Sequence, residues 1–237
     1  MDKVFTFWEG NMPAYIDLCL RTWKVPYTLL TYDNLHEYTD LPIEPLKRFT
    51  LPKVADAVRV HVLRDHGGYW LDADTIMITD KLPTTNLIGY PDKRESTAGF
   101  LYADRPNSDL FTAWAEYQDG VIADLNCSQH WSVLVNMFSD PYVRKHPKVT
   151  ISPVRNCWPE TYMIPLNMSR YDKYQQFYFG GNGSCHLSDL DPTNMIMLHN
   201  SWTPDWYKAM SADDVLAINY TLSNILREVL NEDRKPE

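Results

Sequence analysis

Short apolar runs and amphipathic stretches alternate along the first third of the chain. Residues 4–8 and 27–32 are apolar and β-type, and between them residues 14–23 repeat apolar side chains at helical spacing. A longer amphipathic stretch, residues 52–67, begins with a proline and closes on a glycine, which is where helices favour these two residues. Strands that alternate with helices predict an α/β fold with a mostly parallel central sheet.

The rest of the chain has a less regular pattern. The elements it predicts are strands at 69–71, 75–78 and 97–103, helices at 108–117 and 128–138, an aromatic β-hairpin with mobile loops at 174–184, an apolar run at 194–199, and one long helix at 211–230 with a capping box of Ser211 and Asp214. Neither an internal repeat nor a low-complexity linker divides the chain, so the sequence favours a single domain.

Composition narrows the range of functions. The net charge of −9 and the pI near 5.2 argue against broad attraction to nucleic acid. The four cysteines are far apart and form no C-x-x-C pair, which suits free thiols in a reducing cytosol. The sequence contains neither a signal-peptide pattern nor a run of about 18 apolar residues, so we expect a cytoplasmic protein without a transmembrane segment.

Two aspartates stand one residue apart where an apolar run ends, in GGYWLDADTIMI at residues 67–78. Asp72 and Asp74 would lie at the carboxyl edge of the sheet, near Trp8 and Asp33, and this edge is where α/β folds bind ligands. Their carboxylates are the hard oxygen ligands that Mg²⁺ or Mn²⁺ prefers. A second pair with the same spacing, at residues 189–191, has no apolar lead-in and is predicted to be a solvated turn.

The helix before these aspartates carries Asp56 and Arg59, three residues apart and therefore on one face. They form either a surface ion pair or a site at which the carboxylate accepts sugar hydroxyls and the guanidinium grips phosphate. DADT also matches the D-x-D-x-T of haloacid-dehalogenase-type phosphatases. However, the lead-in contains two glycines, and the later aspartate doublet, Asp213 and Asp214, begins a helix.

Three segments, in this order, resemble bacterial glycosyltransferases that carry a sugar-binding D-x-D region, which include capsular polysaccharide synthesis enzymes. The segments are FWEGNMPAYIDLCLRTW, KVADAVRVHVLRDHGGYWLDADTIMI and MLHNSW. The layout is similar to that of yeast initiating mannosyltransferases and, more remotely, to the glucosyltransferase domains of clostridial toxins. The match is strong over residues 4–80, patchy over 97–138 and short at 195–202.

This resemblance implies a GT-A fold over residues 1–237, with a nucleotide-sugar-binding part at 1–80, acceptor-side and closing elements at 97–205, and a C-terminal helix at 211–231. It also implies a nucleotide-sugar donor, a UDP-hexose by expectation, and a divalent metal, Mn²⁺ or Mg²⁺. The roles that it implies for this chain are nucleobase stacking by Phe7 and Trp8, contacts to the donor sugar and phosphates by Asp56 and Arg59, ribose and metal contacts by Asp72, metal ligation by Asp74 and His199, and closure over the diphosphate by Ser201 and Trp202.

The acceptor side departs from the family pattern. Many relatives have Ser where this chain has Ala55, and the segment 124–138 lacks the Gly-Pro of eukaryotic members and matches another retaining family best at Gln129 and Asn136. The resemblance favours transfer with retention, with Gln129 stabilising positive charge at the sugar C1. An inverting reaction would need a base, for which Asp124 is the candidate.

The remaining alternatives are the phosphatase and a sugar-binding protein that has lost turnover. The expected partners are a nucleotide-sugar and a glycan acceptor. If that acceptor is lipid-linked, the protein would work at the inner face of the membrane, although no basic amphipathic helix indicates this.

Overall fold

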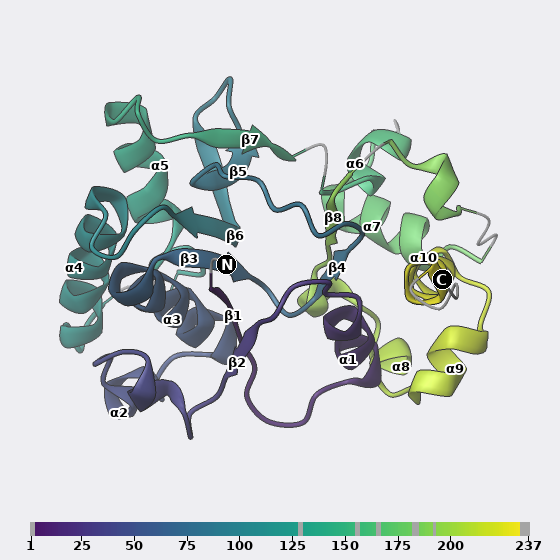
Figure 1. Ribbon diagram of the computed structural model, residues 1–237, viewed down its shortest axis with the longest axis horizontal. Helices are drawn as coiled ribbons and strands as arrows, with labels where there is room; N and C mark the ends of the chain where they lie inside the picture. The colour runs from purple at the N-terminus through teal and green to yellow at the C-terminus, as the bar shows by residue number, and fades with distance from the viewer. Residues whose placement is uncertain are drawn as a thin grey trace. The chain divides into compact units, whose positions relative to one another are not determined.

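The computed structural model describes residues 3–127, 130–154, 157–164, 167–181, 185–191 and 193–232. Its internal contacts divide the chain into two compact units, each assembled from several segments. The first unit comprises Met1–Gly10, Pro26–Asp72 and Pro83–Pro153, and the second comprises Asn11–Val25, Ala73–Leu82 and Val154–Glu237. Each unit contains a sheet of its own (Figure 1).

A six-stranded sheet of order β2-β1-β3-β6-β5-β7 forms the centre of the first unit. Its strands are β1 (Val4–Phe7), β2 (Thr28–Leu30), β3 (Gly68–Leu71), β5 (Leu87–Tyr90), β6 (Glu95–Ala103) and β7 (Ile151–Pro153). β1 pairs in parallel with β2 and β3, and β5 pairs in parallel with β7, whereas β6 runs antiparallel to both β3 and β5. The predicted α/β fold with a mostly parallel central sheet is therefore confirmed.

The parallel pairing of β1, β2 and β3 brings the carboxyl ends of these strands to one edge of the sheet. Trp8 follows β1 directly and donates its backbone N–H to the carbonyl of Leu30, the last residue of β2, at 3.0 Å. Asp72 follows β3 directly. The sequence prediction that Trp8 and Asp72 lie at the same edge is correct.

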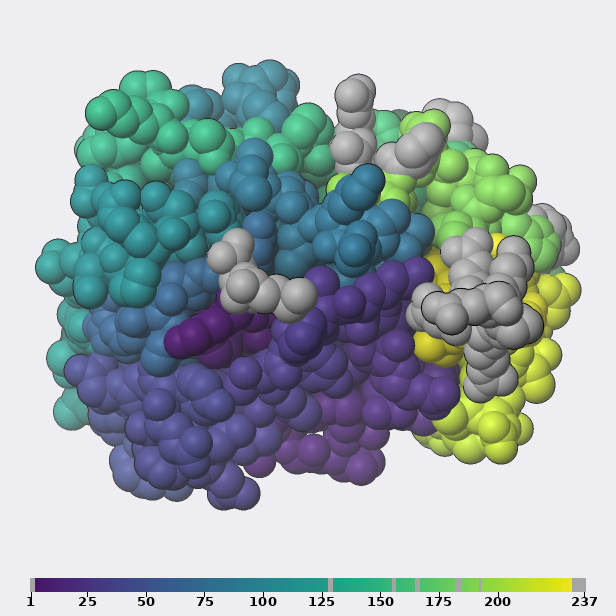
Figure 2. Space-filling model, in the orientation of Figure 1, coloured from purple at the N-terminus to yellow at the C-terminus, as the bar shows by residue number. Residues whose placement is uncertain are grey.

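Helices cover this sheet and bury its apolar residues. They are α2 (Ile43–Leu46), α3 (Leu51–His66), α4 (Asp109–Ala123) and α5 (Asn136–Lys145), with a 3-10 turn, η1, at Leu35–Glu37. α3 packs on β1, β3 and β6, α5 packs on β6, and α4 packs against α3. Figure 2 shows α4 in teal and α5 in green, lying side by side at the surface. Trp70, Phe111 and Trp114 are among the largest buried side chains of this unit's core.

The double glycine ahead of the aspartates is required by close packing of the backbone. Gly67 ends α3 with φ of 65°, and Gly68 begins β3 with φ of 87°, both in the left-handed region. A Cβ on Gly68 would lie 2.3 Å from the carbonyl oxygen of Lys3, just before β1. The glycines therefore allow the chain to leave α3 and pair with β1 within two residues.

The second unit is mostly helical. β4 (Thr75–Met77) pairs antiparallel with β8 (Met195–Met197). The helices are α1 (Ala14–Arg21), α6 (Glu160–Met163), α7 (Arg170–Phe179), α8 (Asp205–Lys208), α9 (Ala212–Ala217) and α10 (Thr221–Glu232), with 3-10 turns η3 (Leu187–Asp189) and η4 (Asn200–Trp202). In the part of the chain that the structure describes, no helix has the length and apolar character needed to span a bilayer.

The aromatic hairpin predicted at residues 174–184 is wrong, because the described part of this segment begins inside helix α7. Ser169 caps α7 and accepts a hydrogen bond from the backbone N–H of Asp172. Tyr174, Phe177 and Tyr178 are buried at helical spacing. Aromatic residues favour strands as well as buried helix faces, and here the spacing of the buried residues and the cap favour the helix.

Two further helix boundaries differ from the prediction. The long helix at 211–230 is two helices, because the chain is extended at Ile218 between α9 and α10. The predicted cap of α9 is correct, since the hydroxyl of Ser211 accepts from the N–H of Asp214 at 3.2 Å. The helix predicted at 128–138 begins only at Asn136, and Gln129 lies outside the described residues.

Candidate functional site

Arg59 joins two carboxylates at the edge of the sheet in the first unit. One nitrogen of its guanidinium, Nη2, lies 3.1 Å from Asp56 and 3.1 Å from Asp72. The other nitrogens donate to the backbone carbonyls of Ala55 and Ala98, and the guanidinium lies over the ring of Trp70. Since every nitrogen has a partner, the guanidinium is held in one orientation.

The pair of Asp56 and Arg59 is buried and is therefore not the surface ion pair that was one alternative. Their side chains are only 14% and 7% exposed. Burial raises the pKa of Asp56 to about 6, because Arg59 only partly offsets the desolvation and the nearby Asp72 raises the pKa further. With both carboxylates ionised, the three groups carry one net negative charge, which suits a cation at their outer side.

Asp72 is held through one of its two carboxylate oxygens. Oδ1 accepts a hydrogen bond from the indole N–H of Trp70 at 2.8 Å and also faces Arg59. Its backbone N–H donates to the carbonyl of Gly99 in β6 at 2.9 Å. The side chain is 33% exposed, and Oδ2 makes no hydrogen bond within the described residues. Asp72 therefore presents one oriented oxygen.

The two aromatic residues predicted to stack on a nucleobase lie in different environments. Phe7 is only 6% exposed, and its ring contacts the edge of Tyr32 at 5.7 Å inside the core. Trp8 is half-buried at the sheet edge, and its indole N–H has no hydrogen-bond partner within the described part of the chain. Trp8 is consequently the better placed of the two to contact a ligand.

Asp74 belongs to the second unit. Its Oδ2 accepts a hydrogen bond from the backbone N–H of Asn200 at 2.7 Å, and its carbonyl accepts from Leu198 at 3.0 Å. The side chain of Asn200 in turn accepts from the hydroxyl of Tyr15 at 2.5 Å. The HNSW segment is thus bonded directly to the second aspartate of D-x-D.

His199 is half-buried beside Arg170 in the same unit. Nη2 of Arg170 donates to Nε2 of His199 at 3.1 Å, while the Arg170 guanidinium stacks on Trp158, 3.3 Å from the ring centre. The imidazole also lies 4.0 Å from the ring of Trp202. Burial and the neighbouring Arg170 lower the pKa of His199 to about 3, so the imidazole is neutral at physiological pH, as a metal ligand must be.

Four residues around these groups were not predicted from the sequence: Tyr15, Trp70, Arg170 and Asn200. Trp70 lies two residues before Asp72, and Asn200 directly follows His199. Their positions in the sequence could therefore have suggested that they belong to the site. Tyr15 and Arg170 meet their partners only through the fold. Of the predicted closing residues, Ser201 is exposed and Trp202 is half-buried, both in η4.

Two of the three residues predicted on the acceptor side, Asn136 and Asp124, lie among the described residues. Asn136 donates its amide to the carbonyl of Ser96 in β6 at 2.8 Å, so it fixes the start of α5 to the sheet. Asp124 is exposed and accepts from the backbone N–H of Asn126 at 2.9 Å. Gln129 lies outside the described residues.

The two carboxylates have the chemistry that a hard divalent cation favours. Asp72 and Asp74 offer carboxylate oxygens, the ligands that Mg²⁺ and Mn²⁺ favour, whereas the acceptor nitrogen of the neutral His199 imidazole, Nε2, is engaged by Arg170. Among the described residues no group of three or more His, Cys, Asp or Glu side chains is arranged to hold a metal ion. The ligation by Asp72, Asp74 and His199 therefore remains a prediction.

The second D-x-D provides an internal comparison. Asp189 ends the short turn η3, where its carboxylate accepts from the backbone N–H of His186 at 2.8 Å. Both Asp189 and Asp191 are exposed. This pair forms the solvated turn that was predicted.

Comparison with solved structures gives several glycosyltransferases of low similarity. A crystal structure of the galactosyltransferase LgtC in complex with donor and acceptor sugar analogues aligns with 12% identity and a TM-score of 0.45, covering 97% of this chain and 95% of that one. An active-site mutant of LgtC aligns with 14% identity and a TM-score of 0.42, covering 87% and 92%. The apo form of the glycosyltransferase GlyE in Streptococcus pneumoniae TIGR4 aligns with 12% identity and a TM-score of 0.42, covering 98% and 62%.

The family of the chain follows from its sequence. A search of curated proteins finds no match. The profile of one family, described as capsular polysaccharide synthesis protein, matches residues 1–148, more than half of the 237 residues. The matched region contains Asp56, Arg59 and both aspartates of the first D-x-D. The chain therefore belongs to the capsular polysaccharide synthesis protein family, as its motifs indicated.

Proposed function

We propose that this protein is a metal-dependent glycosyltransferase that moves a hexose from a UDP-sugar to a hydroxyl of a growing glycan. The buried Arg59, held between Asp56 and Asp72, is the observation that carries the proposal. A guanidinium that is desolvated and fixed in position can stabilise charge on a diphosphate leaving group more strongly than an exposed one. Membership of a polysaccharide synthesis family supports the same class of reaction.

The proposed roles of the donor-side residues are those that the family resemblance implies. Trp8 would pack on the nucleobase, and Asp56 would accept hydroxyls of the donor sugar. Asp72 and Asp74, with His199, would hold Mn²⁺ or Mg²⁺, and Ser201 and Trp202 would contact the diphosphate. A bound divalent cation together with Arg59 would stabilise the negative charge that builds on the β-phosphate as the bond from the sugar C1 breaks.

The proposed stereochemical course is retention. As the bond between C1 and the diphosphate breaks, the acceptor oxygen forms its bond to C1 from the same face. The acceptor proton passes to the departing phosphate oxygen, so no protein base is needed. Gln129 would stabilise the positive charge at C1 from the other face. Inversion would instead need a base such as the exposed Asp124.

The acceptor in this proposal is a glycan. A lipid-linked glycan would bring the reaction to the cytoplasmic face of the membrane. The two other classes considered from the sequence, a D-x-D-x-T phosphatase and an inactive sugar-binding protein, both predict no glycosyl transfer, so one assay separates them from the proposal.

The test is turnover of UDP-glucose, UDP-galactose and their N-acetyl forms, with release of UDP measured in the presence of Mn²⁺ and of EDTA. We expect UDP release from at least one donor with Mn²⁺, its loss with EDTA, and its loss in Asp74→Asn.

The matched control is Asp191→Asn, which changes the second, exposed D-x-D and should turn over donor like the wild type. Release of inorganic phosphate from simple phosphate esters, with no UDP release from any donor, would contradict the transferase and support the phosphatase. Donor binding without turnover would support the inactive sugar-binding protein.

A further inference from the structure

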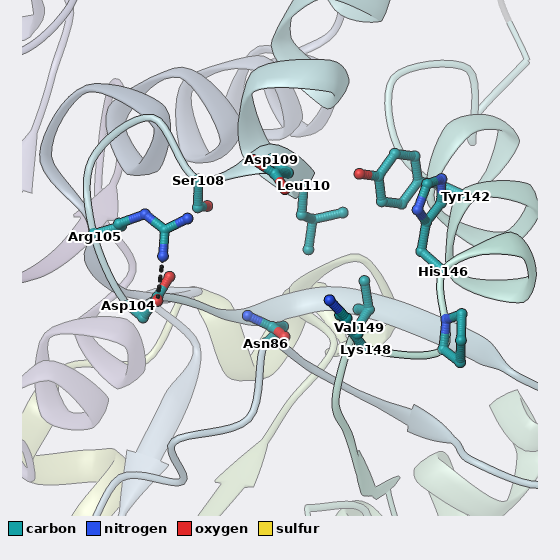
Figure 3. Close-up of a pocket in the computed structure, with 11 residues that line it drawn as sticks. Asn86, Asp104, Arg105, Ser108, Asp109, Leu110, Tyr142, His146, Lys148 and Val149 are labelled. Carbon is teal, nitrogen blue, oxygen red and sulfur yellow. Dashed lines mark hydrogen bonds and ion pairs between the residues drawn. The ribbon is translucent and has the colours of Figure 1, made fainter.

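A cavity of about 440 Å³ opens in the first unit beside the start of α4 (Figure 3). We call it the α4 pocket. Its walls come from the connection between β6 and α4, the first turn of α4, the end of α5 and the loop that follows α5. Asp109, Leu110, Tyr142, Lys148 and Val149 are among the residues that line it. Its volume is within the range of pockets that bind small ligands.

The α4 pocket is separate from the buried cluster around Arg59. α3 and α4 run antiparallel, since Asn107 donates to Arg64 at one end and Gln118 donates to the carbonyl of Asp56 at the other. Asp109 and Gln118 are nine positions apart on α4, which corresponds to about 14 Å along the helix. The pocket therefore lies at the opposite end of α4 from the donor-side carboxylate Asp56.

Two opposite charges that line the pocket, Asp109 and Lys148, are not paired with each other. Within the described residues, neither Asp109 nor Lys148 has an ion pair or a side-chain hydrogen bond, and the pair of Arg105 with Asp104 is the one joined by a dashed line in Figure 3. The hydroxyl of Tyr142 points into the cavity in the same view. Burial and the nearby Asp109 both raise the pKa of Tyr142, which keeps this hydroxyl protonated as a donor.

This arrangement selects the chemistry of a ligand. Asp109 disfavours an anion beside it and Lys148 disfavours a cation beside it, while the charge of Arg105 is offset by Asp104. A neutral molecule with many hydroxyls could donate to the carboxylate and accept from the ammonium and from Tyr142. The apolar side chains of Leu110 and Val149, 5% and 9% exposed, would face its C–H groups. A sugar combines these two kinds of surface.

We propose that the α4 pocket binds one or two residues of a neutral glycan, apart from the donor-side cluster. That its natural ligand is the growing chain rests on the proposed function. A second contact of this kind raises the local concentration of the acceptor, so that successive transfers act on the same chain.

The experiment is a methyl NMR titration of the protein with isotope-labelled Leu and Val. Leu110 and Val149 report on the pocket directly, and the probes are lactose, maltose, mannobiose and chitobiose, with inorganic phosphate as the anion. We expect saturable shifts of both methyl signals with at least one disaccharide, at a Kd of about 1–10 mM. Lys148→Met and Asp109→Asn should each weaken this binding about tenfold or more.

Lys93→Met and Asp92→Asn are the matched controls, because these exposed residues of the first unit lie in the turn between β5 and β6. They should leave the titration unchanged. Absence of shifts with all four disaccharides, or shifts with phosphate alone, would overturn the proposal. The titration contains neither nucleotide nor metal, so its failure is distinct from a failure of UDP-sugar turnover.

Discussion

At the scale of single residues, one guanidinium organises the candidate site. The sequence places Asp56, Arg59 and the first D-x-D on adjoining elements, and the resemblance assigns their roles. The bridge of Arg59 between Asp56 and Asp72 could not be predicted, since it depends on how α3 packs on β3. The contacts of Arg170 with His199 and of Tyr15 with Asn200 join residues 29 and 185 positions apart, for which no local pattern exists.

Arg59→Lys should lower kcat/KM of donor turnover about 100-fold. A single ammonium keeps the charge but cannot contact both carboxylates and the carbonyl of Ala98 together. Steady-state kinetics of UDP release would measure the effect. Arg64→Lys, on the same helix with Asp40 and Asp65 as partners, should change turnover less than twofold and serves as the control.

A second residue-scale prediction concerns Glu160, which is fully buried in the second unit. Burial raises its pKa from 4.5 to about 7, although Arg170 and the hydroxyl of Tyr178 partly oppose the shift. The folded state therefore binds the proton more tightly than the unfolded state. Stability should fall as the pH rises from 4.5 to 7, by about 3 kcal/mol, and should then stay level with respect to this group.

Glu160→Gln removes this ionisation. Urea unfolding at pH 5 and pH 8 should show the variant gaining stability relative to the wild type at the higher pH. Glu116→Gln, an exposed carboxylate on α4, should show no such gain. Equal pH dependence of Glu160→Gln and the wild type would show that Glu160 does not titrate in this range.

At the scale of elements, the accuracy of sequence prediction depended on whether the signal was local. Strands β1, β2, β3, β4 and β6 follow apolar runs, and α3 has a starting proline and a closing glycine; these elements were predicted, whereas β5 and β7 were not. The aromatic segment of α7 is compatible with either a strand or a helix when only neighbouring residues are considered. In the structure its buried residues, Tyr174, Phe177 and Tyr178, lie on one face of a helix. The break between α9 and α10 contains neither proline nor glycine, so the sequence gave no sign of it.

Gly68→Ala tests the junction between α3 and β3. The new Cβ would overlap the carbonyl of Lys3, at 2.3 Å, and would also strain a residue with φ of 87°. We expect a loss of about 2 kcal/mol or more in the free energy of unfolding, measured by urea titration. Gly120→Ala is the control, because a Cβ there meets no atom within 4 Å and alanine favours a helix. A loss equal to that of Gly120→Ala would contradict the packing argument.

At the scale of the whole molecule, the chain passes from the first compact unit to the second within the D-x-D. Asp72 ends a segment of the first unit, and Ala73 begins a segment of the second, so the two carboxylates are fixed by different surroundings. Arg59 and Trp70 hold Asp72, and the N–H of Asn200 holds Asp74. Because only Ala73 separates Asp72 from Asp74, the Cα atoms of the two aspartates are at most about 7 Å apart. The apolar pattern predicts both strands but does not assign them to different units.

The most direct measurement is calorimetric binding of UDP to the wild type and to Asp74→Asn, with and without Mn²⁺. The account predicts that UDP binds the wild type when Mn²⁺ is present, and that binding is lost without the metal or with the substituted aspartate. Asp191→Asn should bind like the wild type. Absence of UDP binding under every condition, or equal binding with and without Mn²⁺, would contradict a metal-dependent nucleotide-sugar site at Asp72 and Asp74.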